Sequence, residues 1–106
     1  MIKKLLLILF ISLTTIVSSQ EKSISNLSAA PNPFNISTQI TFTSSKTSNV
    51  IFTIINVLGK TVHKKVFKAK KGLNNIPFSK GNLNTGVYIY SLQNETKIIS
   101  KRFVIK

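Results

Sequence analysis

Apolar and polar residues alternate in short runs from about residue 38 to the end of the chain, and Gly, Pro and Asn separate these runs. A period of two is typical of β-strands that bury one face, because successive side chains of a strand point to opposite sides. No stretch after the N-terminal segment has the period of an amphipathic helix. The pattern predicts strands at 38–44, 49–57, 61–67, 73–78, 87–93 and 97–105, and we count about seven short strands in all.

Residues 49–57 are apolar on both faces, which predicts a strand in the middle of a sheet. Pro77 lacks an amide donor and therefore favours an edge strand for 73–78. Seven short strands with turns between them indicate an all-β fold, and we predict a small immunoglobulin-like antiparallel β-sandwich. The expected core is Ile40, Phe42, Val50, Phe52, Ile54, Val62, Ile76, Phe78, Tyr88, Leu92 and Phe103.

The N-terminus differs in character from the rest of the chain. Lys3 and Lys4 precede an uncharged apolar run from Leu5 to Val17, which has the architecture of a cleavable signal peptide. This run is shorter than the roughly 20 apolar residues that a spanning helix needs. We therefore predict a signal peptide at 1–19, cleaved between Ser19 and Gln20, and a short linker at 20–27 before the folded domain.

The composition excludes most kinds of enzyme. The 106 residues include one His, two acidic residues and no Cys, so neither a catalytic acid–base pair nor a metal cage is expected. The prediction is a non-enzymatic domain that uses no cofactor and no metal.

The chain is strongly basic, with 15 Lys and Arg and a formal net charge of +13. Because the signal peptide predicts export, the expected partner is lipopolysaccharide or another anionic surface and not nucleic acid. A cluster of six lysines suits such a surface, and it equally suits a solvated edge strand that resists pairing with other chains. We expect His63, beside this cluster, to be an exposed strand residue without a role. The clustered residues are Lys60, Lys64, Lys65, Lys68, Lys70 and Lys71.

Four motifs follow one another from Ala30 to the last residue. They are Ala30-Pro31-Asn32-Pro33-Phe34-Asn35 with Thr38-Gln39-Ile40, Ile54-Ile55-Asn56-Val57-Leu58-Gly59-Lys60, Leu83-Asn84-Thr85-Gly86-Val87-Tyr88, and Ser100-Lys101-Arg102-Phe103-Val104-Ile105-Lys106. In this order the motifs resemble the type A C-terminal sorting domains of the type IX secretion system of diderm bacteria. The resemblance covers residues 28–106. A related resemblance is to the immunoglobulin-like domain of flagellar hook-capping proteins, whose tryptophan-containing motif is absent here.

The resemblance implies a secretion tag that an outer-membrane translocon recognises. In the family a sortase-like peptidase commonly clips the tag and can attach the cargo to lipopolysaccharide. We accordingly expect a monomer that is exported to the periplasm and then to the outer-membrane surface or the extracellular space. Residues 97–106 offer a basic strand to which a receptor's sheet edge could add. The motif positions are Pro31, Asn32, Pro33, Gly59, Leu83, Gly86, Tyr88, Lys101, Phe103, Val104 and Lys106.

The domain organisation leaves three interpretations open. About ten residues separate Ser19 from the first motif, so we expect no cargo domain before the tag. The chain is then a small self-secreted domain, a fragment of a larger gene product, or a reassigned domain that stays in the periplasm. An alternative function is a small secreted module whose basic face binds anionic surface polysaccharide without any role in sorting.

Overall fold

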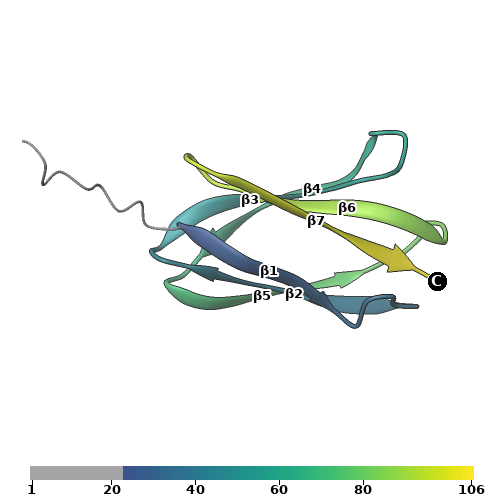
Figure 1. Cartoon of the computed structure of the whole chain (residues 1–106), viewed down its shortest axis with the longest axis horizontal. Coiled ribbons are helices and arrows are strands. Elements are labelled where there is room, and N and C mark those ends of the chain that lie inside the picture. Colours follow the sequence, from purple (N-terminus) through teal and green to yellow (C-terminus); the bar gives the residue numbers. More distant parts are fainter. Residues whose placement is uncertain (1–22) are drawn as a thin grey trace, which may run out of the picture.

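The computed structural model describes residues 23–106, which form seven β-strands and no helix (Figure 1). Within this part of the chain no helix is long and apolar enough to cross a membrane. The predicted signal peptide and its cleavage site at Ser19 and Gln20 lie outside the described residues. The strands are β1 (Ile24–Ala30), β2 (Ser37–Ser44), β3 (Ser48–Ile55), β4 (Thr61–Ala69), β5 (Gly72–Ser79), β6 (Gly86–Gln93) and β7 (Ile98–Ile105).

The strands form two antiparallel sheets that face each other (Figure 1). One sheet has the order β1-β2-β5 and the other the order β4-β3-β6-β7. Aromatic rings from both sheets meet between them, because Phe78 of β5 lies 6.3 Å from Phe52 of β3 and 5.9 Å from Phe103 of β7, measured between ring centroids. The predicted all-β class and the count of about seven strands are confirmed, although the alternation placed only six of them.

Residues 49–55 of the apolar run lie in β3, which takes the predicted central position because it pairs with both β4 and β6, whereas 56–57 belong to the following turn and not to the strand. The edge position predicted for the strand that contains Pro77 is also confirmed, because β5 pairs with β2 alone. Ten of the eleven expected core residues are buried, whereas Val62 is half-buried because β4 is an edge strand. The buried apolar residues that were not expected are Ile24, Leu27, Phe34, Ala69, Tyr90 and Ile105.

Strand β1 was not predicted. Its pairing with β2 shifts by one residue between Ser25 and Ser28, and Asn26 in this bulge has a positive φ of 56°. The extra residue brings both Ile24 and Leu27 into the core at a spacing of three, so the strand lacks the period of two. Residues 24–27, which we assigned to a linker, therefore belong to the folded two-sheet structure.

Candidate functional site

The four motifs meet at one end of the two-sheet structure, which we call the motif end (Figure 1). Two backbone pairings hold this end together, from Lys80 N–H to the Ile36 carbonyl and between Gly86 and Ile105. The β3–β4 turn lies at the same end, because Ile55 of β3 pairs with Ile89 of β6. The motif end thus consists of residues 31–36, 56–60, 80–86 and 103–106.

The segment 31–34 lies along the outer edge of β7, about 70 residues away in sequence. The Asn32 side chain acts as a strand residue would, because its Oδ1 accepts from Val104 N–H at 3.0 Å and its Nδ2 donates to the Arg102 carbonyl at 3.2 Å. Phe34 N–H then donates to the Val104 carbonyl at 3.0 Å, and Lys106 N–H donates to the Phe34 carbonyl at 2.9 Å. The first and last motifs are therefore joined by four hydrogen bonds.

Packing supports the same contact. The Phe34 ring is buried and lies edge-on to the Phe103 ring, with centroids 5.1 Å apart. The buried Thr38 hydroxyl donates to the Pro31 carbonyl at 2.7 Å and so fixes the start of the segment against β2. Pro31, Asn32 and Pro33 themselves remain exposed. Phe34 was not among the expected site residues, although it follows the two prolines directly.

This arrangement changes the expectation for the C-terminal strand. The outward backbone groups at 102–106 already pair with the chain's own 31–34 segment, so this half of β7 is not a free edge. Phe103 and Ile105 are fully buried, whereas Lys106 is exposed and Val104 is half-buried. Strand addition by a receptor along the whole of 97–106, as expected from the sequence, would require the 31–34 segment to leave.

Gly59 lies in the tight turn between β3 and β4. Its φ of 81° is in the left-handed region that only glycine adopts without a steric cost from Cβ. Asn56 supports this turn, because its Oδ1 accepts from both Leu58 N–H and Lys60 N–H at 3.0 Å. Sequence reasoning missed the role of Asn56, which an Asn three residues before a turn glycine could have indicated.

The motif that contains Leu83, Gly86 and Tyr88 forms the connection into β6. The Tyr88 hydroxyl donates to the Asn84 carbonyl at 2.8 Å while its ring is buried beside Phe103. Leu83 packs half-buried against the core, and Gly86 pairs with Ile105 at the start of β6. This motif therefore ties the loop before β6 to the core.

Lys101 lies apart from the other motif residues. It lines an open hollow of about 380 Å³ between β7 and β1, together with Leu27 and Lys97. Lys97 closes one side of this hollow, since its Nζ donates to the Ile24 carbonyl at 3.1 Å. The basic residues of the last motif are therefore split between this hollow, the outward face and the motif end.

The lysine cluster does not form one surface. Neighbouring residues of β4 face opposite sides, so Lys64 lies beside Thr53 on the outward face while Lys65 lies across from the buried Phe52, with its Nζ 5.2 Å from the centre of the Phe67 ring. The spread of charge over an edge strand matches a solvated edge that resists pairing.

His63, expected to be exposed, is half-buried between Phe52 and Phe78, with its ring centroid 5.7 and 5.3 Å from theirs. Burial, with a smaller contribution from Lys65, lowers the pKa of His63 below 6.5.

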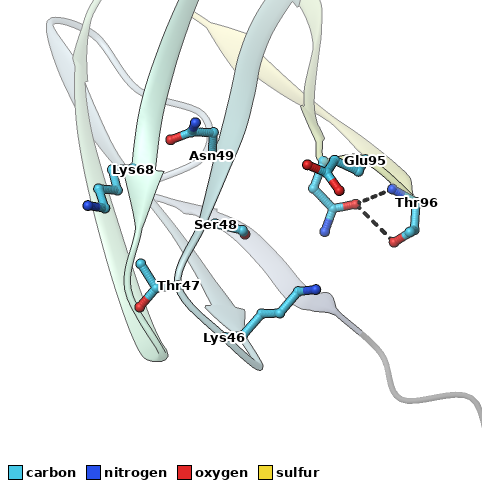
Figure 2. Close-up of a pocket in the computed structure, with 8 residues that line it drawn as sticks. Lys46, Thr47, Ser48, Asn49, Lys68, Glu95 and Thr96 are labelled. Atoms are coloured by element: carbon cyan, nitrogen blue, oxygen red, sulfur yellow. Dashed lines mark hydrogen bonds between the residues drawn. The ribbon is translucent and has the colours of Figure 1, made fainter.

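A second hollow of about 370 Å³ lies at the opposite end of the molecule (Figure 2). Within it, both polar atoms of the Asn94 side chain already have hydrogen-bond partners in the protein. Its Oδ1 accepts from Thr96 N–H and Lys97 N–H, and its Nδ2 donates to Ser23 Oγ. Glu95 is the only acidic side chain in residues 23–106. Nowhere in this range do three His, Cys, Asp or Glu side chains lie together as a metal site would need. The hollow contains no motif residue and is lined by Lys46, Thr47, Ser48, Asn49, Lys68, Asn94, Glu95 and Thr96.

Comparison with known proteins adds one match. The family model described as the secretion system C-terminal sorting domain matches residues 28–106. No curated protein matches the chain. The matched range begins within β1 and includes all four motifs and the whole motif end.

Proposed function

Because the chain belongs to the family of secretion system C-terminal sorting domains, we propose that the motif end is the part of the molecule that the type IX secretion machinery recognises. Residues 28–106 are a C-terminal sorting signal for type IX secretion, and such a signal interacts with the secretion machinery and implies export toward the outer membrane or the extracellular space. The sorting-domain family is not catalytic, and the comparisons do not support the alternative of a polysaccharide-binding module.

The observation that carries the proposal is the pairing of the first and last motifs. Asn32 and Phe34 hydrogen-bond to Arg102, Val104 and Lys106, so motifs at the two ends of the domain form one surface. A receptor that binds this surface recognises the folded domain and not a linear peptide. The buried positions Phe34, Tyr88 and Phe103 hold this surface in place.

The fold we propose for the domain is an immunoglobulin-like sandwich. The sheet orders support it, because β1, β2 and β5 face β3, β6 and β7 as in that fold, with β4 added at the edge beside β3. The Tyr88 hydroxyl bound to a backbone carbonyl four residues upstream, near the start of β6, is the tyrosine corner of such domains.

The finer partners follow from the resemblance. We propose that an outer-membrane translocon binds the domain as a monomer, that a sortase-like peptidase then removes it, and that the site of delivery is the outer-membrane surface or the extracellular space. Export to the periplasm relies on the proposed signal peptide at 1–19. Lipopolysaccharide is the proposed anionic surface for attached cargo.

The test joins residues 20–106 to the C-terminus of an exported fluorescent protein and compares its location in hosts with and without a working type IX translocon. We expect fluorescence outside the cell only where the translocon works. Retention in the periplasm of both hosts would contradict a sorting function.

Residues within the signal are tested by exposed substitutions and not by truncation. Removing 101–106 deletes the fully buried Phe103 and Ile105 and would unfold the domain, so lost export would have two causes. The variant Lys106→Glu changes an exposed charge at the motif end, and Lys70→Glu changes one at the opposite end. We expect only the first to reduce export.

A further inference from the structure

The motif residues in and next to the motif end divide into two sets by the direction in which their side chains point. Ile54, Tyr88, Phe103 and Ile105 point inward and are buried, so the core accounts for them. Their neighbours Ile55, Val87 and Val104 lie on the opposite face of the same strands, where the core cannot require an aliphatic residue. These outward positions need a separate explanation.

The outward aliphatic residues lie side by side. Ile55 pairs with Ile89 across β3 and β6, and Val87 pairs with Val104 across β6 and β7. We call these four residues the outward patch. Val87 and Ile89 are 42% and 41% exposed although β6 is an inner strand of its sheet, because no element among residues 23–106 covers this face.

The patch continues toward the β3–β4 turn. Val57 and Leu58 follow Ile55 in the chain and are 77% and 88% exposed. The Asn56 side chain and Gly59 hold the turn that presents them. Single exposed aliphatic residues are ordinary on protein surfaces, whereas a contiguous group is typical of an interaction site.

The charges around the patch are all positive. Arg102 pairs with Ile89 on the same face, and Lys60 ends the adjoining turn. Glu95, the sole acidic side chain of residues 23–106, lies at the other end of the molecule. A partner surface with carboxylates around an apolar centre would complement this arrangement.

We propose that the outward patch binds a protein of the secretion machinery whose surface presents aliphatic side chains inside a rim of carboxylates. A protein fits better than a lipid surface, because the four residues of the outward patch lie on the face of a sheet, which packs against another protein layer, and Val57 and Leu58 only adjoin that face. This inference rests on the proposed function, and it specifies which face of the domain the secretion machinery recognises.

The experiment uses the fluorescent fusion in the host with a working translocon and compares two matched double variants. Val87→Thr with Ile89→Thr changes the outward patch, and Val66→Thr with Ile98→Thr changes two residues of the same face, 61% and 60% exposed, toward the other end. Threonine retains the branched shape that strands favour. We expect the first variant to lower export roughly tenfold through lost apolar burial in the complex, and the second to leave export unchanged.

The charge of the partner is tested by Arg102→Glu, with Lys71→Glu in the turn at the opposite end as its control. Lower export of the first variant alone supports an acidic rim, and equal export of both overturns it. Melting temperatures of all the purified fusions must match that of the unmodified fusion, and a variant that melts early is replaced by Val87→Ser alone.

The remaining outcomes are distinguishable. Full export of the Val87→Thr, Ile89→Thr fusion overturns the patch and leaves the sorting function standing. No translocon-dependent export of the unmodified fusion overturns both. If the purified fusion binds anionic lipid vesicles and loses this binding in the Val87→Thr, Ile89→Thr variant, the patch binds lipid, and a protein occupant is refuted.

Discussion

The hydrogen bonds of Asn32 permit the sharpest test of how the first and last motifs are joined. Asn32→Ala removes both side-chain bonds to β7, one from Val104 N–H and one to the Arg102 carbonyl. Each such bond contributes a net stability of about 0.5–1.5 kcal/mol. The two bonds together therefore contribute about 1–3 kcal/mol. Because the contact is exposed, water replaces the lost partners, and we expect the free energy of unfolding to fall by an amount in the lower half of this range, about 1–2 kcal/mol.

Two measurements detect this change in residues 20–106. The loss corresponds to a melting temperature lower by roughly 4–16 °C in a domain of this size. Hydrogen exchange reports the contact itself, because the Val104 amide loses its acceptor, and its exchange should accelerate by roughly 5- to 30-fold where it opens locally. Urea denaturation gives the free energy of unfolding independently.

Two further variants isolate the cause. Asn32→Asp keeps an acceptor for Val104 N–H but removes the donor to the Arg102 carbonyl, so we expect an intermediate loss of stability. Asn75→Ala makes the same truncation on the exposed side of β5 and should change stability by less than about 0.5 kcal/mol. An Asn32→Ala variant as stable as Asn75→Ala, with unchanged Val104 exchange, would refute the reasoning.

Three other predictions concern the motif turns and the histidine. Tyr88→Phe leaves the Asn84 carbonyl without its donor and should lower the free energy of unfolding in urea by about 1–2 kcal/mol, and an unchanged urea midpoint would contradict this. Gly59→Ala should lower the free energy of unfolding by about 1–2 kcal/mol, because φ is 81° while the space around the turn is open. Gly59→Asn should lower it by less. Equal melting temperatures of the two variants would argue against a conformational cause. Burial lowers the pKa of His63 in the folded state, so as the pH falls the unfolded state binds a proton at this residue before the folded state does. The contribution of the neutral His63 to stability is therefore complete above pH 6.5 and is lost as the pH falls below it. The melting temperature should therefore drop between pH 7.5 and pH 5, with a smaller drop in His63→Gln, and equal drops in both proteins would exclude this residue.

The alternation of apolar residues predicted six of the strands within one or two residues of their ends because the period of a strand is a local property. The largest differences are two residues, at the ends of β3 and β4, and that of β3 has a local cause, since the Asn56 side chain bonds to the following backbone and begins the turn two residues early. Strand β1 escaped prediction because its bulge places Ile24 and Leu27 in the core at a spacing that alternation does not describe.

The assignment of motif residues as candidate site residues came from the sequence, but their roles came from the packing. Val104 and Phe103 are adjacent in one motif, yet one lies on the outward face and the other is fully buried. His63 was expected at the surface because lysines surround it in sequence, and its contacts with Phe52 and Phe78 arise only when two sheets face each other.

The sequence by itself therefore determined the all-β class, the central place of β3, the edge place of β5 and the family to which the chain belongs, because these depend on periodicity and on short motifs. Only the tertiary structure decided that the segment 31–34 covers the C-terminal half of β7, that Lys101 lies away from the other motif positions, and that the outward aliphatic residues form one patch. These features join residues up to about 70 positions apart, and such contacts depend on how the sheets pair and pack and not on any local pattern.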